Sequence, residues 1–130
     1  MPKRRRSKAP PPLSELEAEV MEDVWGRGAS TVRDVLESLN AGPKQRAYTT
    51  VMTIMTRLDE KRILTRKRQG KTDVYRAAIS REAYRAARAE AEVGAVIAQF
   101  GELALAQFAA QAGTLDARRV RELRRLAEGG

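Results

Sequence analysis

The sequence predicts a mainly α-helical protein that carries one short β-hairpin. Apolar residues recur at helical spacing along most of the chain, and two strand-like runs at 63–68 and 73–77 flank a glycine turn. A chain of 130 residues has room for one compact domain and an appendage. We therefore divide it into a disordered basic arm at 1–12, a compact head at 13–79 and a helical region at 80–130.

Three helices are expected in succession in the head. The first runs from a Ser14 cap to the glycines at 26–28, the second from the pair at 30–31 to the breakers at 40–43, and the third spans 48–61. The hairpin follows directly. Helix, helix, helix and hairpin is the order of a winged helix-turn-helix, so that fold is predicted for the head.

The region after Ser80 is expected to be helical and to mediate dimerisation. Its composition shifts to Ala, Arg and Glu. Gly94 and Gly101 are both expected to bend or break a long helix, and Thr114 predicts the start of a last one. These helices have too few apolar residues for a core of their own, so we expect a second copy to cover them, with packing onto the head as the alternative. The dimerisation candidates share an apolar side chain at helical spacing: Val96, Ile97, Phe100, Leu103 and Phe108.

Charge is distributed unevenly along the chain. The net charge is +8, and residues 44–76 hold ten basic residues against three acidic ones, whereas residues 13–43 hold two against seven. The arm at 1–12 adds five basic residues and no acidic one. Either contact with DNA or a solvating role would explain this charge. Basic residues that neutralise phosphates release counterions. Nucleic acid is therefore the expected partner, ahead of an anionic membrane surface.

Several function classes are excluded by what the chain lacks. It contains no Cys and no His, which removes disulfides, thiolate or imidazole metal ligands and the usual nucleophile and base pairs. We therefore expect no enzyme activity, no cofactor and no metal. No apolar stretch approaches the length of about 18 residues that a membrane helix needs. We expect no membrane insertion and a location in the cytoplasm.

The third predicted helix carries an unusual outer face. Its apolar stripe leaves Thr49, Thr53 and Thr56 pointing away from the core, although β-branched residues are unfavourable on an exposed helix. A short hydroxyl and methyl suit base edges in a major groove, while a tolerated polar face is the alternative. Basic side chains on the hairpin are expected to bind phosphates. The DNA-binding candidates are Lys44, Arg46, Tyr48, Thr49, Thr50, Met52, Thr53, Arg57, Arg66, Lys67, Arg68 and Lys71.

The chain resembles the penicillinase-repressor and methicillin-repressor family of bacterial winged-helix proteins. An ordered series of motifs carries the resemblance, and it covers nearly the whole chain after the arm. The matching stretches are Leu13–Met21 with Val24 and Trp25, Thr31–Val35, Ala47–Thr53 running into Arg57 and Leu58, and Lys61–Leu64 through Tyr75.

The resemblance implies a winged helix followed by a three-helix dimerisation region, and a homodimer that binds a palindromic operator in double-stranded DNA. By position, it places base and backbone contacts on Thr49, Thr50, Met52 and Thr53. Met52 stands where some relatives have a basic residue, so an apolar contact is implied there.

The resemblance also implies a route of inactivation. Family repressors are cut when a membrane-bound metalloprotease sensor detects a β-lactam, and the matching bond here lies between Gln107 and Phe108. Relatives have Asn where this chain has Gln107. Independently of any cut, Phe108 is expected in the core of the dimer.

Two function classes are compatible with these features. One is a sequence-specific transcriptional repressor, with β-lactam-response genes as the targets that the resemblance suggests. The other is an architectural protein that binds DNA with little regard to sequence, for which the net charge of +8 would suffice. The threonine face favours the repressor, because a nonspecific binder has no use for an uncharged base-reading surface.

Overall fold

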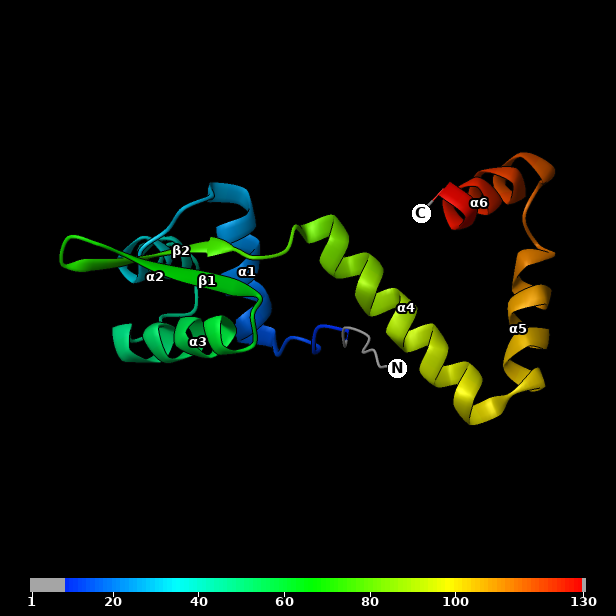
Figure 1. The fold of residues 1–130 in the computed structure, drawn as a ribbon, viewed down its shortest axis with the longest axis horizontal. Coiled ribbons are helices and arrows are strands. Elements are labelled where there is room, and N and C mark those ends of the chain that lie inside the picture. Colours follow the sequence, from blue (N-terminus) through cyan, green and yellow to red (C-terminus); the bar gives the residue numbers. More distant parts are fainter. Residues whose placement is uncertain (1–8, 130) are drawn as a thin grey trace, which may run out of the picture. The chain divides into compact units, whose positions relative to one another are not determined.

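The computed structural model describes residues 9–129, which form six helices and a two-stranded antiparallel sheet (Figure 1). Residues 1–8, which hold the basic run of the predicted arm, lie outside the described residues. The described chain divides into two compact units, one ending at Ala89 and one beginning at Glu90.

The head contains the three predicted helices, and local capping explains where the first two begin. The Ser14 hydroxyl accepts from the Glu17 amide while the Glu17 carboxylate accepts from the Ser14 amide, and Thr31 and Asp34 form the same capping box. Ser30, predicted together with Thr31 as the start of the second helix, instead pairs with the hairpin. The bounds are α1 at Glu15–Arg27, α2 at Val32–Asn40 and α3 at Tyr48–Glu60.

The hairpin is confirmed as the wing that follows α3. Strand β1 spans Leu64–Gln69 and pairs antiparallel with β2 at Thr72–Ala77, in a register that sets Gln69 opposite Thr72. Gly70 has φ 65°, a left-handed value that glycine adopts without steric cost. The wing is joined to the helices through Ser30, whose amide and carbonyl pair with the backbone of Tyr75. The head is therefore a winged helix.

One apolar core holds the head together. From α3 it takes Val51, Met55 and Leu58, each with no exposed surface. Because these side chains recur every three or four residues, the opposite face of α3 is left to solvent. The other buried side chains of this core are Val20, Met21, Val24, Val32, Val35, Ile54, Ile63, Leu64, Tyr75 and Tyr84.

The first turns of helix α4, which spans Arg81–Phe100, belong to the head. Tyr84 is 7% exposed in the core, and its ring lies 5.7 Å from that of Trp25. The Trp25 indole donates a 2.9 Å hydrogen bond to the carbonyl of Ile79, which holds the connection between β2 and α4. The first unit thus ends at Ala89, ten residues beyond the predicted boundary, because an aromatic side chain of α4 completes its core.

The chain before α1 contacts the same helix. The Tyr84 hydroxyl donates a 2.7 Å hydrogen bond to the carbonyl of Pro11, and the Arg88 guanidinium donates one of 3.1 Å to the carbonyl of Pro10. Proline carbonyls have no helix or strand partner in this segment, so side chains of α4 satisfy them. The last residues of the predicted arm therefore pack on the head.

The second unit contains the end of α4 and two further helices, α5 at Glu102–Ala112 and α6 at Ala117–Gly129. Gly101, with φ 59°, separates α4 from α5, whereas Gly94 lies inside an unbroken α4. The prediction that Thr114 caps the last helix is wrong. Its hydroxyl donates to the Gln111 carbonyl, and Asp116 instead accepts from the Arg119 amide at 2.8 Å.

We expect Tyr84→Ala to destabilise the head by about 3 kcal/mol, because it removes a large side chain from a closed core. Tyr84→Phe keeps the ring and loses only the hydrogen bond to Pro11, a cost of about 1 kcal/mol. The measurement is urea unfolding of a fragment ending at Ala89. Arg85→Ala, an exposed change one residue away, is the control and should stay within about 0.5 kcal/mol of the wild type. Equal stability of Tyr84→Ala and the control would contradict the burial.

Candidate nucleic-acid interface

Helix α3 presents Thr49, Thr50 and Thr53 to solvent, whereas Thr56, also predicted to point outward, is half-buried. Thr49 and Thr53 are exposed at the centre of the face opposite the buried stripe, as the helical spacing predicts. Tyr48 and Met52, which are 42% and 40% exposed, lie on the flank that faces the wing. Thr50 and Arg57 are also exposed and lie on the other flank. The exposed face is therefore uncharged at its centre.

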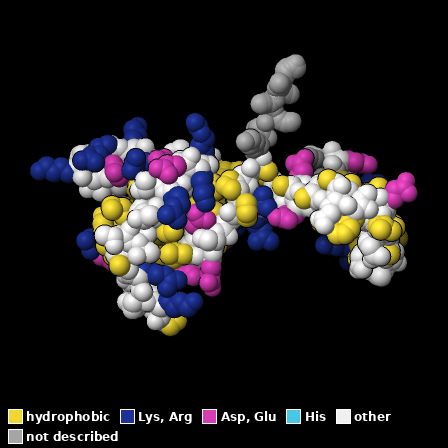
Figure 2. All heavy atoms as spheres, turned by 90° about the horizontal axis from the view of Figure 1, so that it is seen from below, with side chains coloured by type: hydrophobic (Ala, Val, Ile, Leu, Met, Phe, Trp, Pro, Cys, Tyr) yellow, Lys and Arg dark blue, Asp and Glu magenta, His cyan; other side chains and the backbone are white. Residues whose placement is uncertain are grey.

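The wing divides its predicted basic residues between two faces. Arg66 is paired with Tyr75 and Arg68 with Asp73, on the face that Tyr75 turns toward the helices. Neighbouring residues of a strand point to opposite sides, so Lys67 lies on the other face of the hairpin. The structure therefore brings Arg66 and Arg68 toward α3 and leaves Lys67 away from it. The dark blue side chains at the left edge of Figure 2 belong to the wing end of the head.

A groove lies between α3, the wing and the first turn of α2, and we call it the wing groove. Its volume is about 440 Å³. The lining residues are Thr31, Val32 and Arg33 from α2 and its cap, Tyr48, Met52 and Thr56 from α3, and Arg66, Arg68, Lys71, Thr72, Asp73 and Tyr75 from the wing.

Carboxylates in and beside the wing groove orient two of its arginines. Asp73 lies 3.4 Å from the Arg68 guanidinium and 4.0 Å from that of Arg66, and Asp59 of α3 lies 3.8 Å from Arg66. All four side chains are partly exposed, so these pairs contribute little to stability. Their effect is to direct the two guanidinium groups along the wing, where they remain reachable from solvent.

Arg33 also lines the wing groove, although the charge pattern and the resemblance do not predict it. Its guanidinium lies over the Tyr48 ring, with its carbon 5.5 Å from the ring centroid. Thr31 lines the same groove next to it. The signal in the sequence is weak, because Arg33 is one of two basic residues in an acidic stretch, residues 13–43. Only the packing of α2 against α3 brings it to the interface.

The predicted basic residues before α3 lie away from the wing groove. Arg46 pairs with Glu19 of α1 at 3.1 Å, and its amide donates a 2.7 Å hydrogen bond to the side chain of Asn40. These contacts attach the loop before α3 to the head. Lys44 is exposed in that loop and does not line the wing groove. The structure therefore groups neither residue with the wing arginines.

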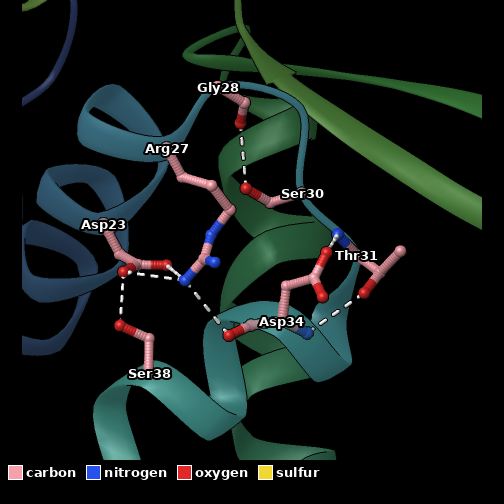
Figure 3. A network of polar contacts seen from close by, with 7 residues as sticks. All are labelled: Asp23, Arg27, Gly28, Ser30, Thr31, Asp34 and Ser38. Atoms are coloured by element: carbon pink, nitrogen blue, oxygen red, sulfur yellow. Dashed lines mark hydrogen bonds and ion pairs between the residues drawn. The ribbon is translucent and has the colours of Figure 1, made fainter.

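A polar network fixes α2, which forms one wall of the wing groove (Figure 3). The Asp23 carboxylate of α1 accepts from the Arg27 guanidinium at 2.8 Å and from the Ser38 hydroxyl at 2.5 Å. Arg27 also donates to the carbonyl of Asp34 at 3.3 Å. The side chain of Asp34 is turned back to the Thr31 cap, and these hydrogen bonds lower the pKa of its carboxyl. Both turns of α2 are thus attached to α1.

An ion pair with a buried carboxylate fixes the C-terminal end of α3. The Lys61 ammonium lies 2.8 Å from the Glu17 carboxylate, whose side chain is 5% exposed. Burial raises the pKa of Glu17, but hydrogen bonds from Lys61 and Ser14 outweigh it, so the pKa lies below its usual value. The pair holds the C-terminal end of α3 against the first turn of α1.

The predicted dimerisation residues have no shared core within the second unit. Leu103 is 72% exposed, Phe100 52% and Phe108 41%, while Val96 is also exposed and Ile97 is half-buried. Leu123 and Leu126 of α6 are exposed as well. Yellow side chains stand open on this region in Figure 2. Among the described residues from 101 onward, only Ala104 is buried.

Within residues 9–129, no group of three or more acidic side chains is placed to hold a metal ion. None of the described helices combines the length and the apolar character that crossing a membrane requires.

Comparison with known proteins supports this interpretation of the head. The family model described as penicillinase repressor matches residues 13–129. The chain belongs to the penicillinase repressor family. The family resemblance predicted from the motifs of the head is therefore confirmed.

Individual relatives match only part of this penicillinase repressor family member. The transcriptional regulator BlaI of Mycobacterium tuberculosis is 41% identical over 64 residues, which cover 48% of this chain and 46% of that protein. The match thus spans about half the length of the curated relative. The solution structure of the DNA binding domain of the repressor BlaI has 27% identity and a TM-score of 0.52, and covers 60% of this chain and 94% of that chain.

A second solved structure is similar to the same extent. It is the monomeric form of Bacillus licheniformis BlaI in complex with the blaP half-operator, with 27% identity, a TM-score of 0.50 and coverage of 60% of this chain and 94% of that chain. The penicillinase repressor head thus has the same fold as a domain that was solved on DNA.

We expect acid to weaken the head through Glu17. Its lowered pKa means that the Lys61 pair stabilises the fold above the pKa of the unfolded chain, about 4.3, and that this contribution is lost as the pH falls through the lower folded value. Glu17→Gln should therefore lower the free energy of unfolding at pH 7 and make it less dependent on pH between about 5 and 3. Urea unfolding across this range is the measurement.

The control for Glu17→Gln is Glu15→Gln, which removes an equal charge from an exposed position in the same helical turn. It should leave the pH dependence close to that of the wild type. The same loss of pH dependence in both variants would contradict a specific role for the ion pair.

Proposed function

We propose that this protein is a sequence-specific, DNA-binding transcriptional repressor and not an enzyme. The observation that carries the proposal is the exposed threonine face of α3. It lies beside the wing groove, which basic residues of α2 and the wing line. An uncharged face flanked by positive charge suits a helix that enters a major groove while its surroundings hold phosphates. Family membership and the fold shared with a half-operator complex support it.

The proposed interface separates base reading from phosphate binding. Thr49 and Thr53 read base edges, with Met52 in apolar contact and Thr50 and Arg57 at the far flank. Short hydroxyl-bearing side chains let the helix backbone come close to the bases. Arg66, Arg68 and Lys71 bind phosphates beside the wing groove and set the register of the head without selecting sequence. Lys44, Arg46 and Lys67 lie outside this set.

A second function has one feature in its favour. The net charge of +8, with five bases in the first twelve residues, suits an architectural protein that binds DNA of any sequence. Such a protein would bind selected and random duplexes with similar affinity at the same salt concentration. A repressor would prefer its selected site by about 10³-fold or more. That ratio distinguishes the two functions.

We propose that the protein acts as a homodimer on a palindromic operator. The apolar side chains exposed along α4 and α5, Leu103 and Phe100 above all, support this because water contact with so many large apolar groups is unfavourable. A two-fold axis would cover the same face of both copies and pair two heads with two half-sites.

Inactivation by proteolysis would act on that dimer. The proposed cut between Gln107 and Phe108 lies within α5, far along the chain from the residues that read DNA. A membrane-bound metalloprotease sensor that responds to β-lactams is the agent that family membership suggests. Cutting there would leave each winged helix intact and remove the gain of about 10² to 10⁴ in apparent affinity that linked binding provides.

We expect Thr49→Val and Thr53→Val to lower affinity for a site selected from random duplexes by tenfold or more, because valine keeps the shape and loses the hydroxyl. Affinity for random DNA should stay within about twofold, since these residues make no phosphate contact in this proposal. Fluorescence anisotropy at fixed salt is the measurement. Thr65→Val, an exposed threonine on the far face of the wing, is the matched control and should leave both affinities unchanged. Equal losses on both DNAs would contradict base reading.

We expect a chain that ends at Gln107 to be a monomer at micromolar concentration, because it lacks Phe108 and α6. The double change Leu103→Asp and Phe108→Asp in the full chain should have the same effect by placing charge on the apolar face. Both should retain binding to a single half-site and lose most of the affinity for a two-half-site duplex. Sedimentation velocity and anisotropy are the measurements. A dimer of wild-type affinity in either case would place the interface elsewhere.

A further inference from the structure

Arg33 lies on the surface of the head against an aromatic ring. It is the second residue of α2, and its guanidinium carbon lies 5.5 Å from the ring centroid of Tyr48, the first residue of α3. A cation over an aromatic face is attracted by the ring's negative quadrupole. The contact therefore joins the two helices of the helix-turn-helix at the point where α3 begins.

The charge of Arg33 is not neutralised within the described chain. Other arginines around the head have carboxylate partners, such as Arg27 with Asp23 and Arg68 with Asp73. Arg33 has no ion pair in residues 9–129, and the neighbouring Asp34 carboxylate is directed to the Thr31 cap instead. The Arg33 guanidinium is therefore available to bind an anionic ligand.

The surroundings favour a phosphate as that anion. Arg33 lines the wing groove, and so do Arg66, Arg68 and Lys71, whereas the carboxylate among the lining residues is Asp73, which already has two arginines beside it. The positive end of the α2 dipole lies at the same place. Since the groove is close to the start of α3, a DNA strand that borders the major groove would bring its backbone there.

We propose that Arg33 binds a backbone phosphate of the DNA at the wing groove, and that Tyr48 is the positioning residue that holds the guanidinium there. This inference rests on the proposed function and adds a contact from α2 to it. Tyr48 then acts through Arg33 and does not read a base. The bases of a duplex are stacked on one another, so their faces are not open to a tyrosine ring at the edge of the groove.

The test uses the full-length protein, a selected duplex and a random duplex over a series of salt concentrations. Arg33→Gln should lower affinity for both duplexes by the same factor, and should reduce the slope of log affinity against log salt by about 0.9, the value for one phosphate contact. Arg33→Lys should keep the slope because it keeps the charge. Arg85→Gln, which removes an exposed arginine from α4, is the matched control and should change neither quantity.

Variants of Tyr48 separate positioning from direct contact. Tyr48→Phe keeps the ring and should bind as the wild type does, whereas Tyr48→Leu should lose about two- to fivefold on both duplexes, which is the expected strength of an exposed cation–π contact. Combined with Arg33→Gln, Tyr48→Leu should cause no further loss. Circular dichroism confirms that each variant is folded.

Three results would overturn the inference. They are an unchanged salt slope in Arg33→Gln, additive losses in the double variant, and a loss in Tyr48→Phe equal to that in Tyr48→Leu, which would assign the hydroxyl to DNA. Failure of the proposed function looks different. In that case the wild type itself would bind the selected and random duplexes equally, whatever the salt slope of Arg33→Gln.

Discussion

The candidate interface depends on one backbone pairing, that of Ser30 with Tyr75. The amide of each residue donates to the carbonyl of the other, at 2.9 and 2.8 Å, and each residue is 1% exposed. Buried hydrogen bonds of this kind are costly to break, because the amide and the carbonyl would be left without a partner where water cannot replace it. The pairing holds the wing beside the start of α2. Without it, the wing groove would lose the fixed distance between two of its walls.

The head then surrounds α3 with further attachments, and each of them uses a different kind of contact. The Arg27 network fixes α2, the Glu17 and Lys61 pair fixes the end of α3, and the Tyr84 ring closes the core from α4. The residues proposed to touch DNA are left largely out of these attachments. A threonine can therefore be changed in α3 at little cost to the fold, which separates recognition from stability.

The second unit has the opposite character. Its helices expose large apolar side chains such as Leu103 and Phe108, and in the described chain after Gly101 only Ala104 is buried. Helices of this length gain most of their stability from packing an apolar face. The proposed dimer would therefore be needed for the order of this region as well as for DNA binding.

The order of elements, the caps at Ser14 and Thr31 and the threonine face were determined by the sequence itself, because periodicity and capping act over three or four residues. Contacts between distant segments were decided only by the tertiary structure. It brought Arg33 to the wing groove and drew Tyr84 into the head. No local pattern encodes these outcomes, since each depends on which surfaces meet when the helices pack.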